Sequence, residues 1–192
     1  IIGAWFDDRD RMTAFVIAST AITHRDPRAH AGALAIAIAA HHAVRDRNVD
    51  AGVVLEHIRT RIADDELLRA LDRVETALAK QLAPVELADE LGLARGVTGY
   101  VHHTVPICLH AWLRAPLDFE RAVADVIELG GDSDTTGAIV GALAGASAGE
   151  GAIPSRWLAI ADVPRSLTWL RALADRLNAH GEPLRLWWPL IP

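Results

Sequence analysis

A glycine-rich run in the second half of the chain contains residue types that suit metal binding. From Gly130 to Gly137 it combines a glycine pair, the carboxylates of Asp132 and Asp134, and three hydroxyl side chains. Carboxylate and hydroxyl oxygens are hard ligands that suit Mg²⁺, Mn²⁺ or Ca²⁺. Glycine accepts the positive φ angles that a ligand loop often needs. The run therefore predicts a metal site.

Two other interpretations of this run start from the helix that follows it. Asp134 to Thr136 lie where the helix is expected to begin, and the free N–H groups of a helix start can hold an anion such as a phosphate. Asp, Ser and Thr are also the favoured N-cap residues, and one cap contributes about 1 kcal/mol. A single cap does not require two carboxylates, three hydroxyls and two glycines. Residue chemistry alone nevertheless leaves both the metal site and the helix cap open.

A stripe of glycines marks the helix after this run. Gly137, Gly141, Gly145 and Gly149 recur every four residues and so lie on one face. Glycine costs a helix interior about 1 kcal/mol relative to alanine, so we expect another backbone to pack closely against this face. The apolar run is shorter than the roughly 20 residues of a membrane span, which favours a buried helix.

The elements that must position this run are expected to be helices throughout. The apolar residues follow helical spacing, and no segment shows the alternation of a strand. Pro106 is expected to interrupt its helix near the start, and Asp118 is expected to cap the helix at 119–129. The apolar tail 183–190 is expected to pack on the protein or on a partner. The expected helices cover about 10–20, 30–45, 50–62, 65–82, 85–91, 104–113, 119–129, the segment after 134, a short helix after Pro154, and 165–179.

Composition narrows the class of protein. The chain has 192 residues, of which 51% are apolar and only 5% aromatic, which predicts a single all-helical domain over residues 1–192. The net charge of −6 argues against nucleic-acid binding. The single cysteine, Cys108, is expected in the core. No signal segment or long apolar span is present, so we expect a cytoplasmic protein that does not enter a membrane.

Three stretches, in order along the chain, resemble the signature of the ADP-ribosylglycohydrolase family. The first resembles a Thr-His-x-x-Pro motif, the second a Gly-Tyr segment and the third the metal loop of the family. They are Thr23-His24-Arg25-Asp26-Pro27; Gly99-Tyr100-Val101 with Thr104-Val105-Pro106; and 130–136 with 141–146, Ala152-Ile153-Pro154 and Trp157.

The resemblance implies an orthogonal multi-helix fold and a set of site residues. Asp132, Asp134 and Thr135 would form the C-terminal half of a site for two metal ions, Mg²⁺ or Mn²⁺. The substrate-contacting residues would be His24, Gly99, Tyr100 and Gly131, with Tyr100 against the adenosine part of ADP-ribose.

His24 and Tyr100 could also have purely structural roles. His24 could be a helix cap or a satisfied core histidine, and Tyr100 a buried aromatic with a bonded hydroxyl. His103 departs from the family pattern, in which an aspartate is frequent. The histidines expected to be structural or exposed are His30, His41, His42, His57 and His180.

The resemblance implies a metal-dependent hydrolase that removes ADP-ribose from a modified protein by cleaving a glycosidic bond. The first metal motif and the catalytic acid of the family are absent, so the chain resembles a C-terminal portion. It would be a truncated enzyme, a fragment, or one half completed by a separate chain. The alternative is a non-catalytic relative that binds ADP-ribose or a partner protein.

Overall fold

The computed structural model describes residues 1–160 and 166–179. Its contacts divide the chain into two compact units, residues 1–152 and 153–192. The expectation of one domain over residues 1–192 therefore stays a prediction. Within the described ranges the chain forms helices and no strand, which confirms the all-helical fold.

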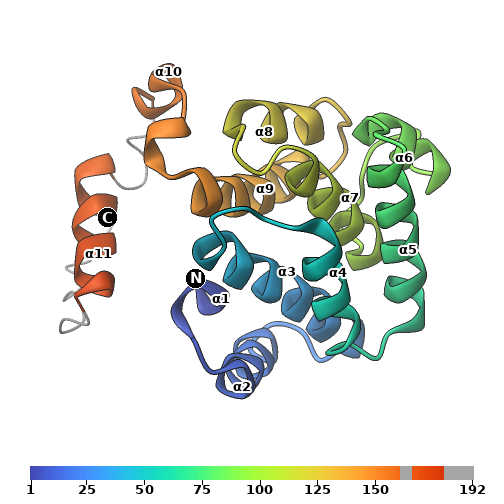
Figure 1. Cartoon of the computed structure of the whole chain (residues 1–192), viewed down its shortest axis with the longest axis horizontal. Coiled ribbons are helices and arrows are strands. Elements are labelled where there is room, and N and C mark those ends of the chain that lie inside the picture. Colours follow the sequence, from blue (N-terminus) through green and yellow to red (C-terminus); the bar gives the residue numbers. More distant parts are fainter. Residues whose placement is uncertain (161–165, 180–192) are drawn as a thin grey trace, which may run out of the picture. The chain divides into compact units, whose positions relative to one another are not determined.

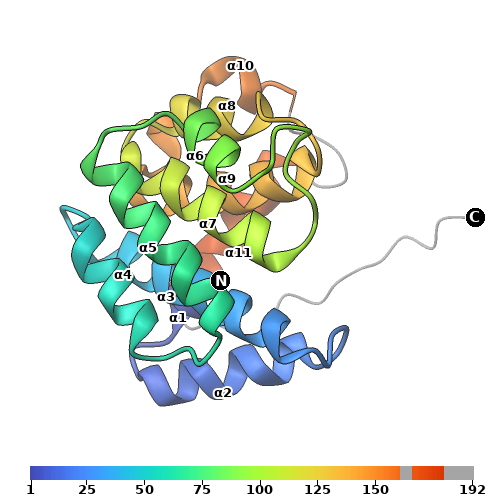
Figure 2. The same cartoon turned by 90° about the vertical axis from the view of Figure 1, so that its right-hand side faces the viewer.

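Residues 1–152 form a bundle of helices that cross one another at various angles (Figures 1 and 2). The second unit contributes two described helices, α10 and α11. The bounds are α1 (Ile2–Trp5), α2 (Arg9–Thr20), α3 (Pro27–Arg45), α4 (Ala51–Arg59), α5 (Asp65–Ala79), α6 (Pro84–Glu90), α7 (Val101–Arg114), α8 (Phe119–Ile127), α9 (Ser133–Ala148), η1 (Glu150–Ala152), α10 (Ser155–Leu158) and α11 (Leu167–Asn178).

Aspartates start most of the longer helices of the first unit. In each case a side-chain oxygen accepts a hydrogen bond from a backbone N–H in the first turn, which satisfies a donor that has no partner within the helix. These N-caps are Asp8, Asp26, Asp50, Asp64 and Asp118, which start α2, α3, α4, α5 and α8. The expected cap at Asp118 is confirmed.

Helices α3 and α7 form the centre of the first unit. In both views α3 runs between α2 and the pair α7 and α9, and it contacts α1 and α4 as well. Most side chains of α7 are buried, including Trp112, whose indole N–H donates to Ser147 Oγ of α9 at 3.0 Å. Burial of these apolar surfaces is the main term that stabilises the unit.

The predicted helices exist, but several begin earlier than the periodicity indicated. Helix α3 starts at Pro27 rather than near residue 30, because Asp26 caps it and proline fits the first helical position. Helix α7 starts at Val101 and runs without a break through Pro106. The expected interruption was wrong, because the close packing around α7 offsets the hydrogen bond that proline cannot donate.

The glycine stripe of α9 accommodates side chains, which corrects the expectation of a close backbone contact. A Cβ added at Gly137 would lie 2.9 Å from Ile127 Cδ1, and the nearest atoms at Gly141 and Gly145 belong to the Phe119 ring and, at Gly141, also to Val123. Helix α8 therefore packs its apolar side chains onto the stripe. Only four of the sixteen residues of α9 are buried, so the expectation of a buried helix was wrong.

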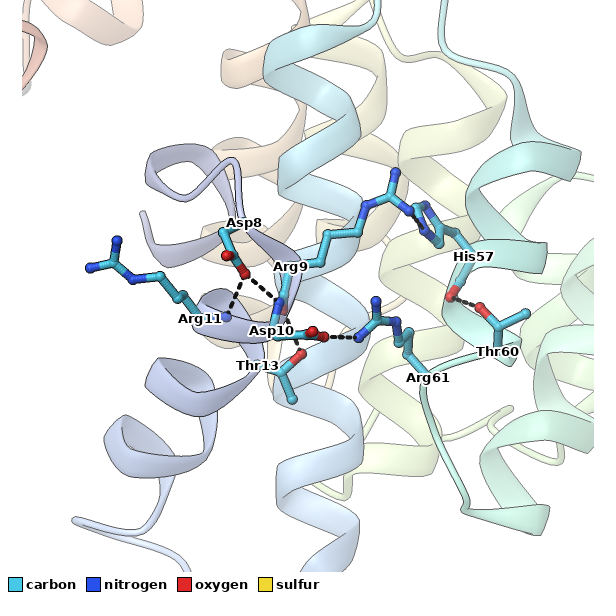
Figure 3. A network of polar contacts seen from close by, with 8 residues as sticks. All are labelled: Asp8, Arg9, Asp10, Arg11, Thr13, His57, Thr60 and Arg61. Atoms are coloured by element: carbon cyan, nitrogen blue, oxygen red, sulfur yellow. Dashed lines mark hydrogen bonds and ion pairs between the residues drawn. The ribbon is translucent and has the colours of Figure 1, made fainter.

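Polar contacts join α2 to α4 at the edge of the bundle (Figure 3). An Arg9 guanidinium nitrogen donates to His57 Nε2, and Arg61 Nη1 lies 2.8 Å from Asp10 Oδ1. The chain of contacts continues inward, because His57 Nδ1 lies 2.8 Å from His42 Nε2. These contacts give His42 and His57 a structural role, as expected.

The single cysteine lies in the core, as expected, and two further predictions fall on residues outside the described ranges. Cys108 is a core residue, and burial raises the pKa of its thiol to about 12. His180 and the tail 183–190 lie outside the described residues. In the part of the chain that is described, no helix has both the length and the apolar character needed to cross a bilayer.

Candidate functional site

The glycine pair of the proposed metal loop adopts the conformation that the sequence predicted. Gly130 has φ +69° and Gly131 has φ +82°, both in the left-handed region that favours glycine. The loop pairs with the segment before α7, because Val97 N donates to Gly130 O at 3.1 Å and Asp132 N donates to Val97 O at 2.6 Å. This pairing brings residues 97–100 beside residues 130–132.

Gly131 is required by this pairing rather than by direct contact with the pocket. A Cβ at Gly131 would lie 2.1 Å from Val97 O, so no side chain fits there. Gly99 has a related constraint, because its Cβ would lie 2.8 Å from Asp132 Oδ2. Two of the predicted glycines thus let the metal loop and the Gly-Tyr segment approach each other.

Asp132 occupies the N-cap position of α9, yet its side chain makes no capping hydrogen bond. The other aspartates that start helices of the first unit all use a carboxylate oxygen to cap. The Asp132 carboxylate instead lies against Gly99 and close enough to the Asp134 carboxyl group to lower its pKa. The simple capping interpretation of Asp132 is therefore wrong.

Asp134 lies in the first turn of α9 and is exposed. Its Oδ1 accepts a hydrogen bond from the backbone N–H of Thr135 at 3.0 Å. The Asp132 side chain, followed by this backbone bond, lowers the pKa of Asp134 below its ordinary value. The two carboxyl groups therefore form one acidic pair at the start of α9.

Beside this loop lies an open pocket with a volume of about 540 Å³. His24, Gly99, Tyr100 and Thr135 line it, so the structure brings together four of the seven predicted site residues. Asp132 reaches this group through its contact with Gly99, whereas Asp134 and Gly131 are not part of the lining.

Tyr100 is held in place at the start of α7. It is 37% exposed, so the buried-aromatic interpretation is wrong. Its ring meets two histidine rings edge-on, with centroid distances of 4.9 Å to His102 and 5.2 Å to His103. His103 is in turn fixed by a contact of 2.8 Å between its Nδ1 and Thr98 Oγ1. One face of the tyrosine can thus meet a ligand while the histidines hold its position.

His24 lies in the loop between α2 and α3, on the wall of the same pocket. Its side chain is exposed, which rules out a core role, and it makes no helix cap. The Thr23 hydroxyl lies 2.8 Å from His24 Nδ1 and orients the ring. His24 is therefore free to present Nε2 to a ligand.

Sequence reasoning missed the part of the pocket wall that α3 forms. One face of α3 contributes Ala29, Gly32, Ala33 and Ile36, which share the i, i+3, i+4, i+7 spacing. That spacing was visible, but the alanine-rich helix offered no polar residue to single out this face. Asp26 and Arg28, at the start of the helix, also line the pocket, and neither was predicted as a site residue.

Among the described residues, no third His, Cys, Asp or Glu side chain joins the acidic pair to form a metal site. Across residues 1–160 and 166–179, no group of three or more His, Cys, Asp or Glu side chains is arranged to hold a metal ion. The donors at the loop are two carboxylates and the hydroxyl of Thr135, which suit a hard cation. They fit part of a coordination shell, and further oxygen ligands would have to complete it.

The fold and the pocket define the class of protein. It is an all-helical protein in which a glycine loop places two carboxylates beside a ligand pocket. The model of the family described as ADP-ribosylglycohydrolase matches residues 1–185. The chain belongs to the ADP-ribosylglycohydrolase family.

Several proteins are similar to this chain. ADP-ribosyl-[dinitrogen reductase] glycohydrolase of Rhodospirillum rubrum is 27% identical over 78% of this chain and 43% of its own length. An uncharacterized protein of Archaeoglobus fulgidus is 33% identical over 73% of this chain and 43% of its own. ADP-ribosylhydrolase ARH3 of Gallus gallus is 25% identical over 79% of this chain and 48% of its own. The chain thus spans less than half the length of these relatives.

Proposed function

We propose that this chain carries the metal-binding part of a hydrolase that removes ADP-ribose from a modified protein by cleaving an N- or O-glycosidic bond. The observation that carries the proposal is the Asp132 carboxylate, which is not used as a cap and is placed against Gly99 and Asp134. Two neighbouring carboxyl groups repel when both are ionised. A divalent cation relieves that repulsion.

In this proposal Asp132, Asp134 and Thr135 hold Mg²⁺ or Mn²⁺, which when bound orients a sugar and polarises a water molecule. The residues of the chain itself bind and position the ligand. Tyr100 offers a stacking face to the purine, and His24 offers Nε2 as a polar contact. A further protein segment, on the same polypeptide or on a separate chain, supplies the remaining metal ligands and the catalytic acid.

The second candidate function is a non-catalytic relative that binds ADP-ribose or a partner protein. The observation that favours it is the acidic pair without a third metal-binding side chain among the described residues. In this case the same pocket binds its ligand without metal, through Tyr100 and the wall formed by α3.

Calorimetric titration of ADP-ribose, with and without Mn²⁺ or Mg²⁺, distinguishes the two. We expect binding that requires metal and that is lost in the double variant Asp132→Ala/Asp134→Ala. Asp50→Ala is the matched control, because Asp50 caps α4 and does not line the pocket. Metal-independent binding that the double variant retains would favour the non-catalytic function. No binding, even with the segment that completes the site present, would refute the hydrolase proposal and the ADP-ribose-binding form of the alternative.

Hydrolysis needs its own test. An ADP-ribosylated protein is incubated with the chain and Mn²⁺, alone and with a segment that supplies the missing ligands, and free ADP-ribose is quantified. We expect release only with the complete site. Release that persists unchanged in Asp132→Ala/Asp134→Ala would contradict the role given to the acidic pair.

Replacement of Tyr100 tests the stacking contact. We expect Tyr100→Leu to weaken ADP-ribose binding about tenfold, because stacking of a base on an aromatic ring contributes about 1–3 kcal/mol. Tyr100→Phe keeps the ring and is the matched control, with a change of less than about threefold. Equal losses in the two variants would show that the hydroxyl, rather than the ring face, makes the contact.

A further inference from the structure

A second pocket lies on the other side of the histidines that hold Tyr100. We call it the α5–α7 pocket; it has a volume of about 210 Å³. Glu66, Arg69, Ala70 and Arg73 of α5 share the i, i+3, i+4, i+7 spacing and form one wall. The remaining lining residues are Leu91, His102 and His103.

The positive charges of this pocket are only weakly compensated. Among the described residues, Arg69 has no hydrogen bond or ion pair, and Arg73 Nη1 donates to the carbonyl of Glu90 at 2.8 Å. Like charges at i and i+4 repel on a helix. Arg69 and Arg73 are both exposed on α5 and both line the pocket, so an anion bound there can meet both guanidinium groups and offset their repulsion.

The only acidic side chain in the lining is already engaged. Glu66 Oε2 lies 3.0 Å from His102 Nδ1, and Asp64 Oδ1 lies 3.0 Å from Nε2 of the same ring. His102 is 4% exposed, whereas the Glu66 side chain is 56% exposed, so Glu66 contacts α7 through one carboxylate oxygen and otherwise faces solvent. His103 is held through Nδ1 by Thr98, which leaves its Nε2 for another partner.

We propose that the α5–α7 pocket binds a phosphate group, either free or esterified, through Arg69, Arg73 and His103. Guanidinium groups bind phosphate oxygens through paired N–H donors, and an imidazole N–H adds a further donor. No residue of this pocket belongs to the metal loop. The inference therefore goes beyond the proposed function and does not depend on it.

Tyr100 provides a direct readout, because it is the only tyrosine in the chain. Its ring contacts both His102 and His103 edge-on. A phosphate that binds His103 changes the surroundings of the tyrosine ring. A protein prepared with ¹³C-labelled tyrosine gives a single set of ring signals in NMR, which can be followed during titration without metal or ADP-ribose.

The titration uses inorganic phosphate and, separately, glycerol phosphate, with sodium chloride keeping the ionic strength and buffer keeping the pH constant. We expect a saturable shift of the Tyr100 signals. Arg69→Gln/Arg73→Gln should raise the dissociation constant at least tenfold, and the single variant Arg69→Gln should raise it in the same direction. The matched control Arg47→Gln removes an exposed arginine elsewhere and should change it less than twofold.

The two ligands separate the sources of the phosphate group. Binding of both supports a site for a phosphate carried by a larger molecule, and binding of inorganic phosphate alone supports a site for the free ion. Arg28→Gln reports on the main pocket, which Arg28 lines. The proposal is overturned by the absence of a saturable shift, by a shift that survives Arg69→Gln/Arg73→Gln, or by one that only Arg28→Gln removes.

Discussion

Replacement of Gly131 by alanine is expected to lower the free energy of unfolding by about 3 kcal/mol and to abolish metal-dependent binding of ADP-ribose. The added Cβ would lie 2.1 Å from Val97 O and 2.6 Å from Val97 N, so the two segments must separate. A left-handed backbone costs a residue with a side chain about 1–2 kcal/mol. The two backbone hydrogen bonds that join the segments contribute about 1 kcal/mol each.

Loss of binding follows from the same displacement. The bond from Asp132 N to Val97 O sets the position of the metal loop relative to Gly99 and Tyr100. When the segments separate, the Asp132 carboxylate leaves its place against Gly99. Chemical denaturation measures the stability change, and calorimetry with Mn²⁺ and ADP-ribose measures binding.

Gly130→Ala is the matched control for this prediction. Gly130 has a similar φ of +69°, but a Cβ there meets no atom within 4 Å. The free energy of unfolding of Gly130→Ala should therefore fall only by the cost of the left-handed backbone, about 1–2 kcal/mol. The variant should still bind ADP-ribose in a metal-dependent way. Equal effects of the two substitutions on stability and binding would show that the pairing with Val97 does not position the site.

Local sequence patterns predicted the elements because the relevant physics is local. Helical spacing of apolar residues located the helices, and cap chemistry identified Asp118 correctly. The glycine pair predicted positive φ angles at Gly130 and Gly131, and both are observed. Each of these features depends on residues within about one helical turn of one another.

The features that could not be predicted from the sequence depend on contacts between segments that are distant along the chain. Nothing near Val97 indicates that it pairs with Gly131. Nothing local shows that the Asp132 side chain is held away from the helix it starts, since aspartate before a helix normally caps. The continuous path of α7 through Pro106 is likewise set by the helices around it.

A second large effect is expected at His110, which lies in the core of α7. The side chain is fully buried, and in the described structure neither ring nitrogen has a hydrogen-bond partner. Burial, followed by the nearby positive charge of Arg114, lowers the pKa of His110 from its ordinary 6.5 to about 4. The ring is therefore neutral in the folded protein at pH values where it is charged in the unfolded chain.

The sign of the pH effect follows from this difference. The unfolded chain binds a proton at His110 as the pH falls below about 6.5, whereas the folded protein does so only near pH 4. Protonation thus favours unfolding, and stability falls as the pH decreases through this window. The two pKa values correspond to a loss of about 2 kcal/mol between pH 7 and pH 5.

His110→Leu is expected to remove this dependence. Leucine fills a similar volume without a polar atom, so the variant should be more stable than the wild type at pH 7 by about 1 kcal/mol, the cost of an unpartnered buried polar group. The advantage should grow by about 2 kcal/mol at pH 5. Chemical denaturation at the two pH values measures both changes.

Ile107→Val separates a pH effect from a general change in stability. Ile107 is also fully buried in α7, and removal of one methylene costs about 0.5–1.5 kcal/mol. It carries no titratable group, so its cost should be equal at pH 5 and pH 7. If the gain from His110→Leu were likewise the same at both pH values, His110 would have to be charged in the folded core or neutral in the unfolded chain. Either outcome would contradict a pKa set by burial.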